Sequence, residues 1–207
     1  MSVIIKLASV QNRRDDIPNQ QLAKAIAEIE DSEAIKELVE NLDNRDKNIQ
    51  SDCIKVLYEI GYVKPRLIQQ YVDSFLKLLS SKNNRLVWGG MIALSTIATL
   101  KADRIFEQID QILEAIKKGS VITVDYGIKT LSRVASVKGE YNRKIFPYLV
   151  EHLRSCRPKE IPQHAESISV AVTDDNKSEF LKVLRERKDI LKPSQVKRVD
   201  KVIKLLY

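Results

Sequence analysis

The side chains in this 207-residue sequence best suited to ligating a metal ion are His152, Cys156 and His164. The first two are four residues apart and share one face of a predicted helix, while His164 begins the next helix. Imidazole nitrogen and thiolate sulfur are donors that zinc prefers, usually four of them in a tetrahedral arrangement. The sequence supplies neither a fourth ligand nor a spacing that joins the three. We therefore interpret them as isolated surface or core residues and predict no metal and no cofactor.

Catalytic signatures are missing from the chain. It contains no Walker-type glycine loop, no G-x-G-x-x-G, no H-E-x-x-H and no G-x-S-x-G. Each of these motifs supplies a specific device, such as a phosphate cradle, a zinc-bound water or an exposed nucleophile. Their absence predicts a protein that is not an enzyme.

The elements that position these residues follow an internal repeat. The segment VDYGIKTLSRVA, residues 124–135, matches VWGGMIALSTIA, residues 87–98, in its Val, Gly, Leu and Ala positions at an offset of 37 residues. Nineteen positions in four series keep an apolar residue at this offset: Leu42, Leu79, Ile116, Leu153, Ile190; Ile35, Val72, Ile109, Phe146, Val183; Leu57, Leu94, Leu131, Ile168, Leu205; and Ile60, Ile97, Val134, Ala171. Such a period indicates an array of similar structural units.

Each unit reads as a helical hairpin. Apolar residues recur at spacings of three and four, and only six glycines and six prolines interrupt the chain, so we predict an all-α fold. Short polar turns join the two helices of a unit. We expect partial or capping helices over residues 1–32 and a single domain of about five hairpins over residues 33–207, divided at about 33–69, 70–106, 107–143, 144–180 and 181–207. In the fifth, Glu186 and Arg187 replace apolar residues, which predicts a polar outer face.

One slot of the second helix holds small residues. Gly90 and Gly127 occupy it in successive units and Cys53 precedes them. Because glycine destabilises a helix by about 1 kcal/mol relative to alanine, we expect a neighbouring helix to approach closely there. We interpret Cys53 as a small buried residue. Leucine in place of Gly90 or Gly127 should destabilise the fold, whereas Lys55→Leu should have little effect.

The paired L-x-x-L first helices and I-x-x-L-x-x-I/V-A second helices resemble HEAT repeats over residues 33–207. This resemblance implies an armadillo-like, right-handed α–α superhelix, or solenoid, to which the sequence itself gives a period of 37 residues. HEAT-like folds include alkylpurine DNA glycosylases, which the resemblance makes a less favoured alternative. Their basic groove uses tryptophan and a catalytic aspartate, but Trp88 precedes two glycines here, and Asp125, in the slot of Trp88 one unit later, is the only carboxylate to nominate.

The second helices line the concave side of such solenoids, where partners usually bind. Tyr, Trp and Arg are enriched at binding hot spots. We therefore predict a protein-binding scaffold or adaptor whose candidate contact residues are Lys55, Tyr58, Tyr62, Trp88, Tyr126, Lys129 and Arg133. The alternative is that the aromatic residues close the edges of the core.

Basic residues concentrate in the turns inside the hairpins. These turns hold 12 basic and 4 acidic residues, against a formal net charge of +7 for the whole chain. Stacking would place nine of them along one edge: Lys82, Arg85, Lys117, Lys118, Arg154, Arg157, Lys159, Lys188 and Lys192. This basic edge predicts an alternative function, binding of nucleic acid or an acidic peptide. The competing interpretation is that the cations complement the dipoles of the first helices.

Two cysteines do not make a disulfide framework of the secreted type. The N-terminus lacks a signal-peptide cleavage pattern, and no apolar run reaches the ~20 residues that span a bilayer. We therefore expect a soluble cytoplasmic protein without membrane insertion, and nothing in the sequence indicates its oligomeric state.

Overall fold

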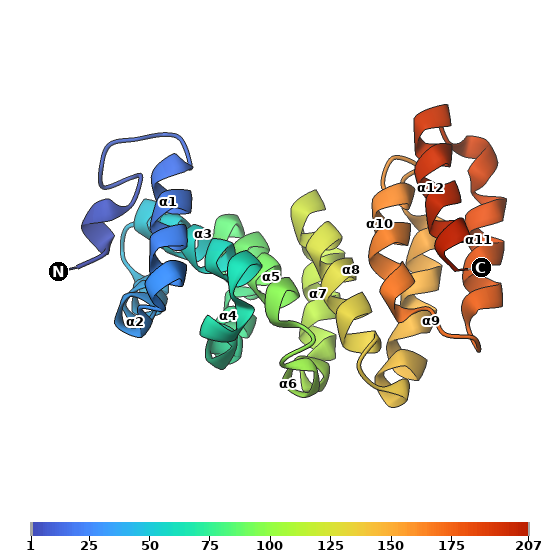
Figure 1. Cartoon of the computed structure of the whole chain (residues 1–207), viewed down its shortest axis with the longest axis horizontal. Helices are drawn as coiled ribbons and strands as arrows, with labels where there is room; N and C mark the ends of the chain where they lie inside the picture. Colours follow the sequence, from blue (N-terminus) through green and yellow to red (C-terminus); the bar gives the residue numbers. More distant parts are fainter. Residues whose placement is uncertain (1, 207) are drawn as a thin grey trace. The chain divides into compact units, whose positions relative to one another are not determined.

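The computed structural model describes residues 2–206, and within that range it contains helices and no strand (Figure 1). This confirms the all-α prediction. The chain divides into two compact units, Met1–Gly127 and Ile128–Tyr207, and the boundary between them lies inside helix α8. The expected organisation as a single domain with five hairpin boundaries stays a prediction.

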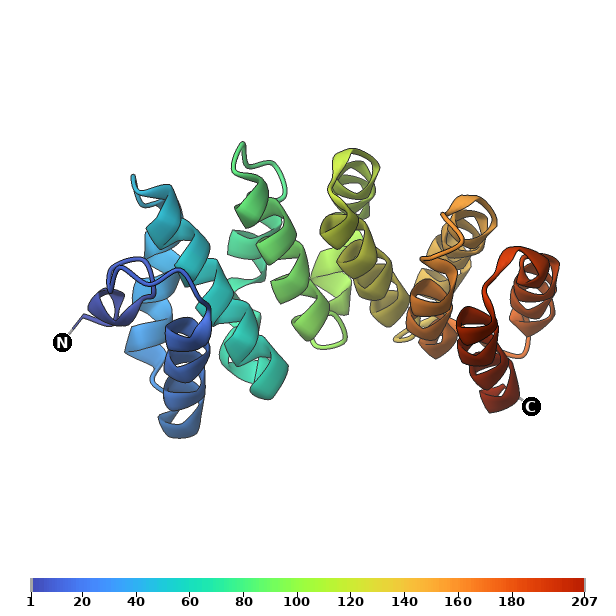
Figure 2. The same cartoon turned by 90° about the horizontal axis from the view of Figure 1, so that it is seen from above.

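The first unit is built mainly from α-helices. Short 3-10 helices lie at Ile4–Lys6, Asn41–Asp43, Pro65–Leu67 and Gln69–Tyr71. The α-helices are α1 (Ile17–Ile29), α2 (Ser32–Glu40), α3 (Lys47–Val63), α4 (Val72–Leu78), α5 (Asn84–Ile97), α6 (Ala102–Glu107), α7 (Ile109–Lys118) and the first part of α8 (Val121–Ala135). Helix α3 packs between α1 and α5, while α2 and α4 pack against α3 and α5 respectively (Figure 2).

The second unit begins with the remainder of α8 and continues through four helices. These are α9 (Gly139–Ser155), α10 (Ile161–Ile168), α11 (Lys177–Glu186) and α12 (Pro193–Leu205), with 3-10 helices at Ser169–Ala171 and Lys188–Ile190. Helix α9 packs with α11, and α10 packs with α12. First helices thus contact first helices, and second helices contact second helices.

Polar side chains in the turns start the helices. Asp31, Asp46 and Asn83 are the N-cap residues of α2, α3 and α5, and each accepts a hydrogen bond from a backbone N–H of the first turn. Such caps satisfy donors that have no partner within the helix and typically contribute about 1 kcal/mol. The same polar turns separate the repeating apolar segments in the sequence.

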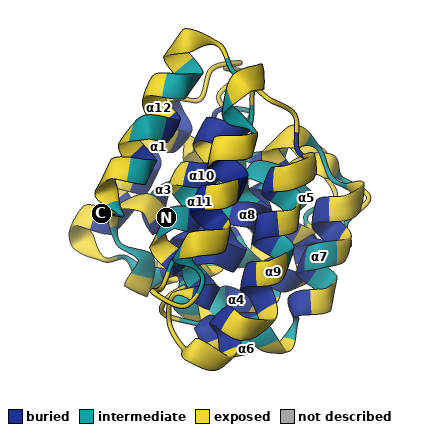
Figure 3. Ribbon diagram, turned by 90° about the vertical axis from the view of Figure 1, so that its right-hand side faces the viewer, coloured by how far each residue is buried: buried dark blue, intermediate teal, exposed yellow. Residues whose placement is uncertain are grey.

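The apolar residues that recur at the 37-residue offset belong to the core. Figure 3 shows the buried faces of the helices in dark blue. Seventeen of the nineteen recurring residues are buried. The exceptions are Ile190 and Leu205, which are 55% and 82% exposed. Both lie in the α11–α12 hairpin, the last one among residues 2–206. The repeat thus predicts the core correctly except in that hairpin.

The glycine slot is a close helix contact, as expected. A Cβ added at Gly90 would lie 2.9 Å from Leu78 Cβ and 3.0 Å from the carbonyl oxygen of Phe75, both in α4. One added at Gly127 would lie 2.3 Å from Ile116 Cγ1 in α7. Cys53, in the same slot, is fully buried, and burial raises the pKa of its thiol to about 12.

The N-terminal segment closes the first unit through a polar network and not through a full helical hairpin. The amide of Asn19, fully buried in α1, donates to Asp52 over 2.8 Å and accepts from the backbone of Ala8 over 3.0 Å. Asp52 also accepts from the backbone N–H of Ser9 over 2.8 Å. The segment before α1 is therefore joined to the N-terminal half of α3 through Asp52.

The first helix of the last hairpin is α11, and the prediction that its outer face is polar is wrong in one respect. Glu186 is exposed, but Arg187 is half-buried. Its guanidinium donates to the carbonyl oxygens of Leu153 over 3.0 Å and Cys156 over 2.8 Å, and also to that of Arg154. These are carbonyls that the end of α9 leaves without intrahelical partners. Arg187 therefore caps a neighbouring helix.

No helix among residues 2–206 combines the length and apolar character needed to cross a bilayer.

Candidate functional site

The candidate site lies in the first unit, along the second helices α3 and α5 and the loop before α1. There the structure forms a groove of about 850 Å³, which we call the Trp88 groove. The segment before α1 contributes Ala8, Ser9, Asn12, Arg13, Arg14, Asp15 and Asp16 to its lining. Helix α3 contributes Asn48, Ser51, Asp52, Lys55 and Tyr58, and α5 contributes Arg85 and Trp88. Of the predicted protein-binding residues, Lys55, Tyr58 and Trp88 are thus brought together.

Aromatic rings extend from this groove along α3. The ring centroids of Trp88 and Tyr58 are 6.3 Å apart, and those of Tyr58 and Tyr62 are 6.0 Å apart in an edge-to-face arrangement. The Tyr62 hydroxyl then donates to the Tyr126 hydroxyl over 2.8 Å. Trp88 and Tyr126 are half-buried and Tyr62 is 45% exposed, whereas Tyr58 is only 5% exposed. Tyr58 therefore supports the other rings more than it presents a contact surface.

Lys55 is committed to contacts within the protein. Its ammonium lies 2.8 Å from Glu59 and 3.3 Å from Asp16, and 5.0 Å from the centre of the Tyr58 ring. Burial lowers the pKa of Lys55, but hydrogen bonding to Glu59 and Tyr58 outweighs this, so the net shift of the pKa is upward. The side chain is 14% exposed. The expectation that Lys55→Leu has little effect therefore does not fit the structure, because that change removes both ion pairs.

The remaining charges of the groove leave two arginines available to a ligand. Asp15 is paired with Arg13, Asp16 with Lys55, and Asp52 with Asn19 and the backbone of Ser9. Arg14 and Arg85 are exposed, and no side-chain partner for either guanidinium occurs within residues 2–206. A guanidinium binds carboxylate or phosphate oxygens in a bidentate way. The groove therefore suits an anionic ligand that also offers a surface to Trp88.

The contribution of the loop before α1 was not predicted from the sequence. Arg13, Arg14, Asp15 and Asp16 lie between two apolar segments, and the ion pair of Asp16 with Lys55 in α3 has a sequence separation that no helical period encodes. The charged run itself is the only sequence signal that marked this loop.

Three exposed apolar residues at or just beyond helix ends were also not predicted from the sequence. Ile29 and Val63 end α1 and α3 and are 75% and 62% exposed, and Leu100, which follows α5, is 39% exposed. An ion pair of 2.7 Å between Glu30 and Lys64 joins the first two helix ends. Val63 and Leu100 obey the 37-residue offset, so the repeat could have revealed them. Exposed apolar side chains in one register favour a protein partner.

Three further candidates lie on α8, which both units share. Lys129 and Arg133 belong to the second unit and are half-buried. Burial, together with the neighbouring charge of Arg133, lowers the pKa of Lys129. Asp125, the carboxylate nominated for a glycosylase, is half-buried in the first unit.

The basic-edge residues differ in their availability. Four of the nine are ion-paired: Lys118 with Glu114 at 2.5 Å, Arg154 with Glu179 at 2.9 Å, Lys188 with Asp200 at 2.7 Å, and Arg157 with Glu160. Lys82, Arg85, Lys117, Lys159 and Lys192 are exposed and make no ion pair within residues 2–206. Within the first unit, Lys82 and Lys118 line a hollow of about 540 Å³ between α4–α5 and α7.

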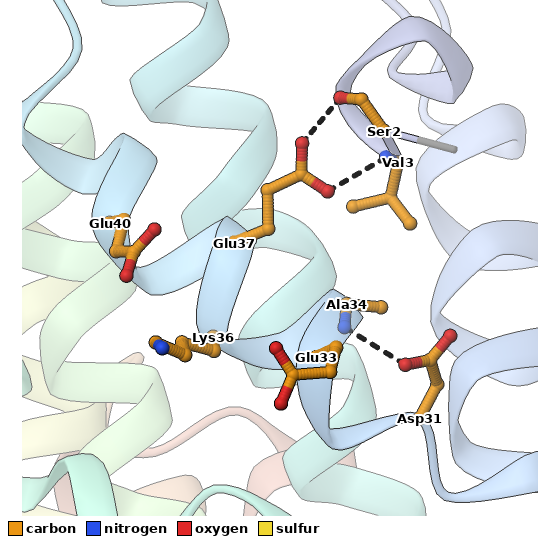
Figure 4. Close-up of a pocket in the computed structure, with 8 residues that line it drawn as sticks. All are labelled: Ser2, Val3, Asp31, Glu33, Ala34, Lys36, Glu37 and Glu40. Carbon is orange, nitrogen blue, oxygen red and sulfur yellow. Dashed lines mark hydrogen bonds between the residues drawn. The ribbon is translucent and has the colours of Figure 1, made fainter.

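A second hollow, of about 490 Å³, lies beside α2 (Figure 4). Its lining is acidic, with Asp31, Glu33, Glu37 and Glu40. Glu37 accepts hydrogen bonds from the Ser2 hydroxyl and, over 2.9 Å, from the backbone of Val3, and Asp31 caps α2 (Figure 4). Two of the carboxylates therefore hold the N-terminal segment and the helix start, and we do not treat this hollow as a ligand site.

Comparison with solved structures places the fold among armadillo and HEAT solenoids. A designed armadillo repeat protein in complex with the peptide (KR)4 matches at a TM-score of 0.68 and 14% identity, over 89% of this chain and 85% of that chain. An engineered protein matches at 0.69 and 17%, over 99% and 96%. Kap121p bound to Nup53p matches at 0.67 and 12%, over 89% of this chain and 21% of that one.

These likenesses confirm the predicted helical-repeat solenoid fold. No protein-family model and no curated protein sequence matches the chain.

Proposed function

We propose that this chain is a non-enzymatic scaffold that binds an acidic, extended segment of a partner protein in the Trp88 groove, on the face formed by its second helices. The observation that carries the proposal is the position of Trp88 and two available arginines, Arg14 and Arg85, in one groove. Carboxylates of the partner would pair with the guanidinium groups, and an apolar side chain would pack on the indole.

Exposed apolar residues support a protein partner over nucleic acid. Ile29, Val63 and Leu100 lie at or just beyond the C-terminal ends of α1, α3 and α5, outside the Trp88 groove itself. Phosphate backbones offer no apolar surface to such residues, whereas side chains of a bound polypeptide do.

One structural neighbour supports binding of a peptide by this fold, but its peptide has the opposite charge to the acidic segment that we propose for this chain. This neighbour is a designed armadillo repeat protein in complex with (KR)4, which is a basic peptide. The arginines of the Trp88 groove would repel such a ligand, because specificity depends on complementary potentials. We therefore infer a related mode of binding with a ligand of opposite charge.

Fluorescence anisotropy with two labelled octapeptides tests this proposal. One peptide alternates Asp and Glu around a central Leu, and the other is (KR)4. We expect the acidic peptide to bind and (KR)4 not to bind. Trp88→Ala should weaken binding by at least about 30-fold, as the loss of a hot spot of about 2 kcal/mol implies. Arg85→Glu should abolish it through charge repulsion.

Lys117→Glu is the matched control, because it makes the same change of charge on α7, outside the groove. Its affinity for the acidic peptide should stay within about twofold of wild type at ~150 mM salt, where the Debye length is about 8 Å. Equal loss in Lys117→Glu and Arg85→Glu would mean that total charge attracts the peptide and would remove the groove from the proposal. We expect this binding to occur in the cytoplasm.

A further inference from the structure

In the second unit, the side chains of His152, Cys156 and His164 lie close together, although we interpreted them from the sequence as isolated residues. His152 Nε2 lies 2.9 Å from His164 Nδ1. The nearest donor atoms of His152, Cys156 and His164 all lie within 4.8 Å of one another. Two imidazoles and a thiol therefore form one cluster, which corrects our expectation that these are isolated residues.

Local backbone structure fixes this convergence. His152 lies in the last turn of α9, and Cys156 follows that helix directly, with its backbone N–H bonded to the His152 carbonyl over 2.8 Å. Five residues, 156–160, then lead into α10, where the backbone N–H of His164 bonds to the Glu160 carbonyl over 3.0 Å. The three side chains are thus held by two helix ends and a short connection.

Two of the three side chains in the cluster are buried, so the cluster is not a chance grouping of surface residues. His164 is fully buried, Cys156 is 8% exposed, and His152 is half-buried. Buried histidine is uncommon unless its nitrogens are satisfied. His152 is thus the most exposed of the three side chains.

The charged groups beside the cluster already have partners. Glu160 accepts from Arg157 through Nε over 2.9 Å and through the backbone N–H over 3.2 Å. Arg187 binds the carbonyl oxygens at the end of α9, including that of Cys156. Glu160 could therefore serve as a fourth ligand only if these contacts broke, and the cationic guanidinium of Arg187 is not a zinc ligand.

We propose that His152, Cys156 and His164 bind one zinc ion, with water in the fourth position. Zinc bonds of about 2.0–2.1 Å to nitrogen and about 2.3 Å to sulfur place tetrahedral ligand atoms roughly 3.3–3.6 Å apart. The separations in this structure, from 2.9 Å to no more than 4.8 Å, lie on both sides of that range. Movements of about an ångström would complete the geometry.

Binding requires two changes of protonation. One imidazole now donates its proton to the other, so it must switch to the tautomer that carries the proton on its remaining nitrogen. Burial, with the charge of Glu160 adding and that of Arg187 opposing, raises the pKa of the Cys156 thiol to about 11. Zinc must therefore displace the thiol proton, which passes to solvent.

Cobalt titration of the 207-residue chain, after treatment with a chelator, tests the proposal. We expect saturation at one equivalent of Co²⁺, tetrahedral ligand-field bands, a thiolate-to-cobalt charge-transfer band, and displacement of Co²⁺ by Zn²⁺. Cys156→Ala should abolish the charge-transfer band and weaken binding by at least about 100-fold, since losing even an outer-shell partner weakens it by 10–100-fold. Cys53→Ala is the matched control and should keep the band, because Cys53 is a buried thiol of the first unit.

His152→Ala provides a second measure, because this half-buried residue tolerates truncation better than fully buried His164. Its circular dichroism should match wild type while cobalt affinity falls at least about tenfold. Absence of saturable binding in the wild-type chain, or a charge-transfer band that persists in Cys156→Ala, would overturn the proposal. The two histidines would then form only a structural hydrogen bond.

Discussion

The hydroxyl of Tyr62, at the end of α3, donates a hydrogen bond to the hydroxyl of Tyr126 in α8, although 64 residues separate them. The bond joins two second helices that are not consecutive in the chain. It also extends the row of rings that begins at Trp88 in the groove. Tyr62 is therefore both a part of the presented surface and a link within the first unit.

This link predicts an unusual ionisation of Tyr62. Burial first, and the hydrogen bond to Tyr126 second, raise the pKa of Tyr62 well above its ordinary value near 10. In an ultraviolet titration of tyrosine ionisation, subtracting the Tyr62→Phe curve from the wild-type curve should show that Tyr62 stays neutral when ordinary tyrosines ionise. Tyr126→Phe should lower the pKa of Tyr62 only in part, because burial is the larger cause.

The sign of the linked stability follows from the same shift. Above about pH 10, Tyr62 ionises in the unfolded chain but not in the folded one, so the free energy of unfolding falls as pH rises. Tyr62→Phe should reduce this fall in chemical denaturation at alkaline pH. An identical pH dependence in wild type and Tyr62→Phe would contradict the raised pKa.

Gly90 and Gly139 should respond in opposite directions to alanine. At Gly90 the new Cβ would meet the Phe75 carbonyl at 3.0 Å, and backbone cannot easily move away, so we expect destabilisation by about 1–3 kcal/mol. At Gly139, in the first turn of α9, only the Arg143 side chain lies near, at 3.5 Å. Gly139→Ala should be neutral or stabilise by up to about 1 kcal/mol. Urea denaturation measures both, and equal midpoints would refute a close contact at Gly90.

Much of the fold could be predicted because two kinds of position recur at the same offset, the apolar core residues and the small residues at helix contacts. The 37-residue offset identifies buried residues such as Leu57 and Leu94, and the glycine slot identifies where helices touch. The failures lie at the ends of the array. Ile190 and Leu205 keep the apolar pattern without a neighbour to bury them. Arg187 departs from the apolar pattern, and its capping role follows only from its hydrogen bonds to carbonyl oxygens at the end of α9.

The candidate site was less predictable because it depends on residues outside the repeat. Trp88 and Tyr58 were identified from their place on the second helices, but Arg14 comes from the irregular loop before α1. Likewise, the spacing of His152 and His164 gives no hint that their rings meet, because the connection between α9 and α10 sets that distance. Periodicity predicts helix faces, whereas loop geometry assembles sites.

Arg187 should stabilise the second unit through its contacts with the end of α9. Replacing it by methionine keeps much of its length but leaves the carbonyl oxygens of Leu153 and Cys156 without this donor. Hydrogen bonds from a charged donor contribute about 1.5–3 kcal/mol, so Arg187→Met should destabilise by about that amount. Lys182→Met is the control, since its exposed ion pair with Glu186 spans 3.8 Å and contributes little. Similar losses in both variants would argue against the capping role.

The basic turns offer the sharpest contrast between a protein partner and nucleic acid. Lys82, Lys117, Lys159 and Lys192 are exposed and make no ion pair within residues 2–206, so changing all four to Glu should leave circular dichroism and melting temperature nearly unchanged. Arg154 and Arg157 are unsuitable for this test because they are paired with Glu179 and Glu160. If the groove binds the partner, the fourfold variant should bind the acidic peptide within about twofold of wild type at ~150 mM salt, where distant charges are screened.

A nucleic-acid function would give the opposite pattern for a labelled oligonucleotide. Wild type would bind it at ~50 mM salt with a dissociation constant below about 100 μM, binding would weaken steeply by ~200 mM salt, and the fourfold variant would not bind. We expect no such binding, because four of the nine basic-edge residues already neutralise carboxylates of the protein. Trp88→Ala separates the two functions further, since it should weaken binding of the acidic peptide without affecting any contact between phosphates and the turns. Salt-sensitive oligonucleotide binding that the fourfold change abolishes and Trp88→Ala preserves would establish nucleic acid as a ligand of the basic turns.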